Sequence, residues 1–124
     1  MKIKLKDWKV QEMNFSIIVK DDRKENSFDL KTSQTFSEEE SNSFSLIFDV
    51  VIKDKDFDLS INMLFIFELD DIVTEEFKIS DFPKINAPAI AFPYLRAFIS
   101  NVTLQSGFEP VMLPSINFVE LAKK

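Results

Sequence analysis

The chain has 124 residues, 14 of them Phe, and a formal net charge of −6. It has no His, no Cys and one Gly, which excludes a His general base, a disulfide, a His- or thiolate-ligated metal and a Gly-rich phosphate loop. Its acidity disfavours nucleic acid and anionic membranes, and no apolar run could span a bilayer. We therefore expect one cytoplasmic domain, 1–124, that inserts in no membrane and needs no cofactor or metal.

The first two-thirds of the chain alternates between apolar and polar residues, as half-buried β-strands do. Near the N-terminus this alternation slips twice. Ile3 and Leu5 stand at odd positions, Trp8 and Val10 at even ones, and the apolar residues return to odd positions at Met13. Each slip predicts a β-bulge, or a bend between two short strands, because a shift of one residue reverses the faces of a strand.

Three further alternating segments follow at 27–35, 43–53 and 57–69, with charged connections at 21–26, 37–42 and 54–56. These connections are too short for helical crossovers, so we expect four antiparallel strands. Alternation assigns Phe44, Phe48, Phe65 and Phe67 to the buried face of the sheet.

The last third has a helical period, with a stripe formed by Ala91, Leu95, Phe98 and Val102. Asn86 is the expected N-cap and Gly107 the C-terminal cap, while Pro93 either kinks this helix or marks its start. Asn117 and Glu120 are spaced as in a capping box and predict a short helix at 118–124. The fold class is thus α+β: a four-stranded antiparallel sheet followed by one long and one short C-terminal helix.

Two other features bear on function. The acidic residues between 70 and 81 favour a solvated loop over a cation site or a pair of catalytic carboxylates. The 14 Phe exceed what one small core needs. This excess predicts oligomer interfaces, a groove for apolar segments of other chains, or both. An enzyme with a Phe-lined pocket and an acid such as Asp49 is the less favoured alternative.

Two stretches in the helical third resemble the SecB export chaperones. Residues 86–96, N-A-P-A-I-A-F-P-Y-L-R, are similar to that family's C-P-N-I-L-F-P-Y-A-R. Residues 107–121, G-F-E-P-V-M-L-P-S-I-N-F-V-E-L, are similar to its G-x-F-P-x-L-x-L-A-P-x-N-F-x-x-L. Both have the family's order and separation, whereas the first 80 residues resemble it only in pattern.

The resemblance implies an ATP-independent chaperone, not an enzyme. SecB proteins are homotetramers, built as dimers of dimers, that hold unfolded or presecretory polypeptides in hydrophobic grooves for translocation, and export members deliver them to SecA. The chain stops at Lys124 without the family's docking tail, so chaperoning is expected more than delivery to SecA. The alternative is a SecB-like chaperone dedicated to one partner, such as the antitoxin of a toxin–antitoxin pair.

The resemblance also assigns roles by position. The implied client groove is lined by Trp8, Phe28, Phe57, Val111, Leu113, Phe118 and Leu121. Tyr94, Arg96 and Phe98 are implied in the oligomer interface, and Glu12 and Asp58 on an acidic face for SecA.

Overall fold

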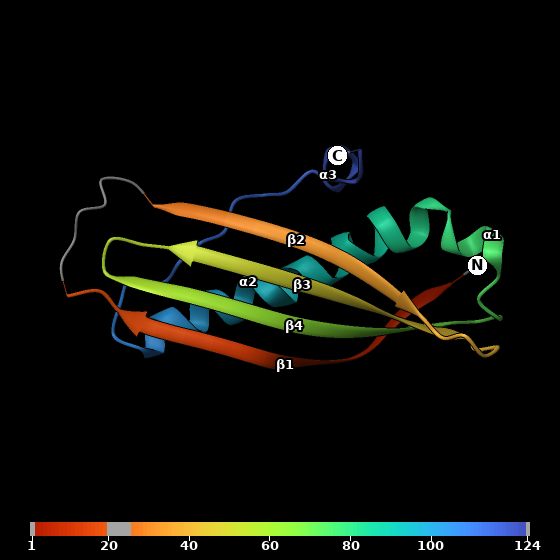
Figure 1. Cartoon of the computed structure of the whole chain (residues 1–124), viewed down its shortest axis with the longest axis horizontal. Coiled ribbons are helices and arrows are strands. Elements are labelled where there is room, and N and C mark those ends of the chain that lie inside the picture. Colours follow the sequence, from red (N-terminus) through yellow and green to blue (C-terminus); the bar gives the residue numbers. More distant parts are fainter. Residues whose placement is uncertain (1, 20–25, 124) are drawn as a thin grey trace.

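The computed structural model describes residues 2–19 and 26–123. Strands β1 (Ile3–Ile17), β2 (Ser27–Phe36), β3 (Ser43–Lys53) and β4 (Phe57–Leu69) form one antiparallel sheet in the order β1-β4-β3-β2. The long helix α2 (Ala87–Gln105) runs along one face of the sheet, and α3 (Phe118–Ala122) lies beside β2 (Figure 1). The expected α+β fold is confirmed, while the expected connection at 21–26 lies outside the described residues except for its last position.

β1 is one continuous strand with two register shifts against β4. They fall between Leu5 and Asp7 and between Val10 and Glu12, where the alternation slips in the sequence. The extra residue at each shift keeps Trp8 and then Met13 on the same face as the core residues of β4. The predicted bulges are therefore present, and the bend between two short strands is not.

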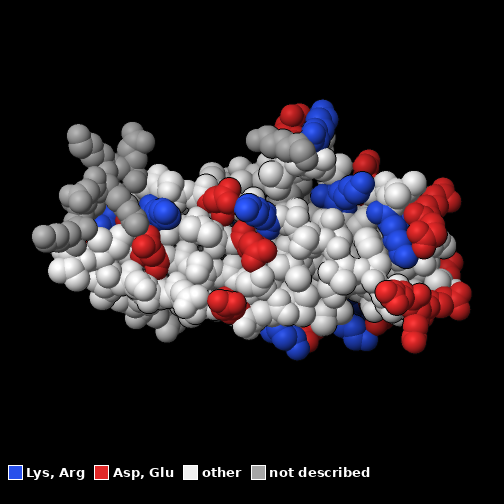
Figure 2. All heavy atoms as spheres, in the orientation of Figure 1, with Lys and Arg blue, Asp and Glu red and all other residues white. Residues whose placement is uncertain are grey.

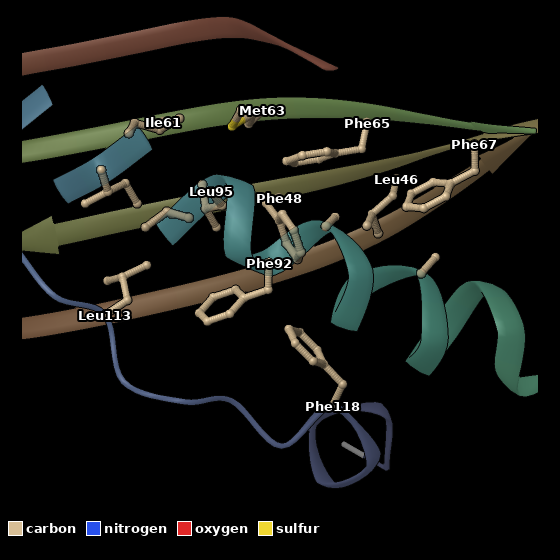
Figure 3. Packing of buried hydrophobic residues seen from close by; sticks show 14 of the residues in the cluster. Leu46, Phe48, Ile61, Met63, Phe65, Phe67, Phe92, Leu95, Leu113 and Phe118 are labelled. Carbon is tan, nitrogen blue, oxygen red and sulfur yellow. The ribbon is translucent and has the colours of Figure 1, made fainter. Parts of the chain in front are cut away.

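The inward faces of β3 and β4 form the centre of the core, and the register pairs them directly. The rings of Phe44 and Phe67 stack at 5.3 Å between centroids, and those of Phe48 and Phe65 meet edge to face at 5.5 Å. All four side chains are buried, as predicted. Figure 3 shows Phe48, Phe65 and Phe67 on the side of the sheet where α2 lies, and Leu95 and Phe92 of α2 pack in the same cluster.

The long helix α2 begins directly after Asn86, as expected, but the Asn86 side chain does not cap it. A π-helical turn, Phe82–Asn86, precedes α2 directly, and Asn86 has helical angles (φ −70°, ψ −44°) with no capping hydrogen bond from its side chain. Helical backbone already precedes Asn86, so its side chain does not stand at a free helix end. Pro93 lies inside α2 and is exposed, so it does not mark the start.

The other helix ends follow local chemistry. Gly107 adopts φ +97° just after the C-cap of α2, as predicted. The Asn117 side chain accepts hydrogen bonds from the backbone N–H groups at 119 and 120, and so caps α3.

The acidic region expected as a loop contains a short helix, α1 (Glu75–Lys78), which the sequence analysis missed. Thr74 caps α1 by accepting from the N–H of Phe77. The Phe77 ring anchors it, because this ring is buried 5.5 Å from that of Phe44.

We predict that Gly107→Ala lowers the free energy of unfolding by about 1–2 kcal/mol. A Cβ at Gly107 would meet no atom within 4 Å, so the cost is that of the left-handed backbone alone. Urea denaturation measures it, with Glu109→Ala, a change at a nearby exposed position, as the control. Equal stability of the two variants would contradict the prediction.

Candidate functional site

An apolar patch on the inward side of β1 is left uncovered by the helices. Trp8, Met13 and Ile17 stand opposite buried β4 residues, yet Trp8 is 42% and Ile17 68% exposed. Tyr94 of α2 joins them, with its ring 4.6 Å from that of Trp8. We call these four residues the β1-edge patch. Sequence reasoning had selected Trp8 and Tyr94 but not Met13 or Ile17, because alternation indicates the face of a residue and not what covers it.

The outer side of α2 carries an open hollow of about 510 Å³. It is lined by Phe92, Pro93, Arg96, Ala97, Ser100 and Met112. The Ser100 hydroxyl donates to the carbonyl of Val111 at 2.7 Å and so holds the segment after α2 against the helix. The Nε of Arg96 is buried and has no hydrogen-bond partner among the described residues. This surface is mostly apolar. Its one charged group is the guanidinium of Arg96, whose Nε lacks a hydrogen-bond partner among the described residues.

A second hollow, of about 240 Å³, lies between β2 and α3. It is lined by Thr32, Gln34, Lys84, Leu121 and Ala122. Phe28 of β2 and Val111 of the segment before α3 are partly buried against the core. We call the hollow together with Phe28 and Val111 the β2–α3 groove. Of the seven residues expected in a client groove, Leu121 lines this hollow, whereas Phe28 and Val111 are partly buried against the core and are not among the residues that line it.

The other four expected groove residues lie elsewhere. Trp8 is on β1, and β1 and β2 are opposite edges of the sheet. Phe57, Leu113 and Phe118 are 1%, 2% and 6% exposed, so the structure places them in the core and corrects the expectation that they line an open groove. The physical reason is coverage by the chain itself. Phe57 packs against Phe108 at 4.9 Å, and Phe118 against Phe92 at 5.6 Å.

The three residues expected in an oligomer interface share α2 but not one surface. Tyr94 and Phe98 are one helical turn apart, whereas Arg96 lines the hollow on the outer side of the helix. Tyr94 is exposed and Phe98 is partly buried against the core.

Glu12 and Asp58 lie on the open face of the sheet, opposite to α2. In the register Glu12 stands across from Asn62, and Asp58 across from Ser16 on one side and Lys53 on the other. A shallow hollow of about 160 Å³ lies on this face beside Glu12. Figure 2 shows both basic and acidic side chains on the open face, with acidic ones gathered at the end of the molecule where α1 lies.

The clearest ion pair of the open face joins Lys6 and Glu68, with 2.6 Å between Nζ and Oε2. The hydrogen bond from Lys6, and then its positive charge, hold the pKa of Glu68 below its ordinary value. The same bond and charge raise the pKa of Lys6. The pair therefore stabilises the folded protein at intermediate pH, where Glu68 is ionised and Lys6 is protonated. Its contribution is lost as pH falls through the Glu68 pKa or rises through the Lys6 pKa.

Within residues 2–19 and 26–123, no three acidic side chains come together in a group that could hold a metal ion. No helix of the described chain has the length and apolar character needed to cross a membrane.

The architecture, a four-stranded antiparallel sheet backed by one long helix and a short C-terminal helix, is that of SecB-like chaperones. The chain superposes on a Mycobacterium tuberculosis SecB-like chaperone, solved in complex with a peptide from the HigA1 antitoxin, with a TM-score of 0.71. The match covers 92% of this chain and 87% of the other at 11% identity. A sequence model of the family described as preprotein translocase subunit SecB matches residues 1–124. The chain belongs to the SecB family.

Two relatives extend the comparison. An uncharacterized protein of Methanocaldococcus jannaschii is 33% identical over 104 residues, which are 79% of this chain and 66% of the relative. The protein-export protein SecB of Ehrlichia chaffeensis is 43% identical over 58 residues, 44% of this chain and 33% of the relative. The chain thus spans less than two thirds of either relative.

We predict that Lys6→Ala returns the pKa of Glu68 toward its ordinary value, because it removes both the hydrogen bond and the positive charge. NMR titration of the Glu68 side-chain carboxyl measures this. Lys9→Ala, on the same strand, is the control and should leave the Glu68 pKa low. A Glu68 pKa that is unchanged in the Lys6 variant would contradict the assignment.

Proposed function

We propose that the protein is a molecular chaperone that binds unfolded or presecretory polypeptides without ATP and keeps them competent for translocation. The observation that carries this proposal is the set of partly buried apolar side chains left at the β2–α3 groove, Phe28, Val111 and Leu121. Exposed apolar side chains that lie together mark sites of interaction. Family membership supports the proposal, as does the name of the Ehrlichia relative, a protein-export protein.

The β2–α3 groove is the proposed client site. Its apolar members, Phe28, Val111 and Leu121, are partly buried and pack against the core. Burial of one client side chain contributes about 1.5–3 kcal/mol, so a single contact is weak and reversible. Several such contacts on an assembly hold a client by effective concentration, and competition can release it. No bond is made or broken, so we propose no enzymatic activity.

The β1-edge patch and the outer hollow of α2 are the proposed interfaces between copies, in a homotetramer built as a dimer of dimers. The patch is apolar and lies at the edge of the sheet. The hollow is lined in part by the short side chains of Pro93 and Ala97, which would let a second helix approach closely. A neighbouring copy would cover Tyr94 and Trp8 and give Arg96 an acceptor. We propose that this assembly works in the cytoplasm, with Glu12 and Asp58 available to SecA on the open face.

A dedicated antitoxin chaperone is the second candidate function. It is favoured by the fold match to a SecB-like chaperone that was solved with an antitoxin peptide. Binding of one such peptide, with no affinity for unrelated unfolded chains, would select this alternative over a general chaperone.

We predict that the protein, at one tetramer per client, suppresses light scattering from a chemically unfolded client diluted into buffer without ATP. Phe28→Ala should weaken client binding by roughly tenfold or more, because it removes an aromatic anchor. Ser33→Ala lies on the same strand but on the open face, and should bind as the unaltered protein does. Absence of suppression would refute the chaperone proposal, and equal binding by both variants would refute the groove.

We predict that Met13→Lys splits the tetramer, because it places a charge within the β1-edge patch. Val51→Lys is a matched control: Val51 is 42% exposed and Met13 41%, but Val51 is on the open face. Sedimentation velocity measures the mass of each variant. The emission of Trp8 should shift to longer wavelength in the Met13 variant as the ring enters water. A monomer from the unaltered protein would contradict the assembly.

A further inference from the structure

The end of the molecule at which α1 lies carries a hollow that neither the proposed client site nor the proposed interfaces use. It has a volume of about 250 Å³ and is lined by Thr74, Glu76, Phe77, Ser80 and Phe82. We call it the α1-end hollow. None of these residues lines the hollow between β2 and α3.

Two aromatic rings form the apolar wall of the α1-end hollow. The rings of Phe77 and Phe82 stack with 6.0 Å between centroids and 17° between planes. Phe77 is 3% exposed and belongs to the core, whereas Phe82 is 37% exposed. Ser80 fixes their arrangement, because its hydroxyl donates to the carbonyl of Phe77 at 2.6 Å and accepts from the N–H of Phe82 at 3.4 Å. Phe82 is therefore an accessible aromatic residue held by a hydrogen-bonded turn.

Glu76 is the one charged residue among those that line the α1-end hollow. It is exposed, and its carboxylate forms no ion pair with any residue in the described part of the chain. Asp81 lies between Ser80 and Phe82 in the sequence, is exposed, and does not cap the π-helical turn that follows. The hollow therefore offers a carboxylate that is open to a partner.

The surroundings of the α1-end hollow are acidic as well. A second hollow that α1 also borders is lined by Glu38, Glu39, Glu40 and Glu75, and there Lys78 pairs with Glu75 at 2.8 Å. Figure 2 shows acidic side chains gathered at this end of the molecule. Complementary charge attracts a partner from a distance, so the preferred occupant is a cation.

Among cationic side chains, arginine matches the α1-end hollow most fully. Its planar guanidinium stacks on aromatic faces and pairs with carboxylates through two N–H donors. The ammonium of lysine is a compact, strongly hydrated charge and makes less use of an aromatic wall. An acidic side chain would instead face Glu76 and be repelled.

We propose that the α1-end hollow binds an arginine side chain of a partner polypeptide, at a surface separate from the β2–α3 groove. The guanidinium lies against the Phe82 ring and pairs with Glu76. An apolar residue beside the arginine packs on Ile79, which belongs to the same turn and is 77% exposed. The recognised element is therefore short: an arginine next to an apolar residue. This interaction goes beyond the proposed chaperone function and does not depend on it.

The test uses three labelled synthetic peptides that differ at one position, which is Arg, Lys or Gln beside a Leu. In fluorescence anisotropy the unaltered protein should bind the Arg peptide about tenfold more tightly than the Gln peptide, because an exposed ion pair and a contact with the ring each add a modest gain. The Lys peptide should lie between the two, and added salt should reduce the differences.

Four variants locate the site. Glu76→Gln removes the charge and Phe82→Ala removes the ring, so each should reduce the preference for Arg over Gln by about threefold. Glu109→Gln, the same charge change at an exposed position outside the hollow, should preserve the preference. Phe28→Ala, which alters the proposed client groove, should preserve it as well.

Equal affinity for the Arg peptide and either of the others, or a preference that survives both Glu76→Gln and Phe82→Ala, overturns the proposed site. Loss of the preference in Phe28→Ala places the arginine in the client groove and overturns it too. A preference that falls in the Glu76 and Phe82 variants and persists in the other two establishes the arginine site, whether or not the protein suppresses aggregation.

Discussion

Phe48 is the point at which the sheet, the long helix and the C-terminal helix meet. Its fully buried ring lies 5.5 Å from that of Phe65 in β4, 6.3 Å from that of Phe92 in α2 and 6.3 Å from that of Phe118 in α3. Each ring buries a large apolar area and needs no hydrogen bond. One cluster of rings therefore joins the two central strands to both C-terminal helices, and its position fixes where the helices can lie.

That position explains which apolar residues remain open. A single long helix centred over the middle strands leaves inward positions on both edges of the sheet incompletely covered. On one edge this exposes Trp8 and Ile17, and on the other it leaves Phe28 partly buried at the rim of the β2–α3 groove. The surfaces to which we assign assembly and client binding are thus consequences of core geometry and not separate additions to it.

The sequence predicts the strands well because burial of one face enforces a period of two, and even the bulges of β1 are visible as slips at Leu5 and Val10. It places the start of α2 directly after Asn86 but misses the π-helical turn Phe82–Asn86, because the apolar stripe has not begun there. It also misassigns Phe57 and Phe118. Alternation gives the inward direction of a side chain but not which distant segment covers it, as Phe108 covers Phe57.

The candidate site was found only in part for the same reason. Val111 and Leu121 were selected through family motifs, whereas Thr32 and Gln34 of β2 and Lys84 of the π-helical turn come from two separate segments that only the fold brings together. In the sequence alone, a polar residue at an inward strand position is an exception to the alternation and does not indicate a site. It becomes informative once the space in front of it is known to be open.

The two edges of the sheet differ in regularity. β1 is interrupted by two bulges, whereas β2 pairs with β3 without a shift through all ten residues and offers the other side of its backbone unpaired. Natural sheets usually protect such an edge, because a regular open edge strand is a template for edge-to-edge pairing with further strands, which leads to fibrils. In this molecule the edge strand β1 is interrupted by bulges, whereas the edge strand β2 is regular. Polymerisation of the purified protein by strand pairing would therefore start at β2. The net negative charge of the chain would oppose this polymerisation by repulsion between copies, and high salt would screen that repulsion.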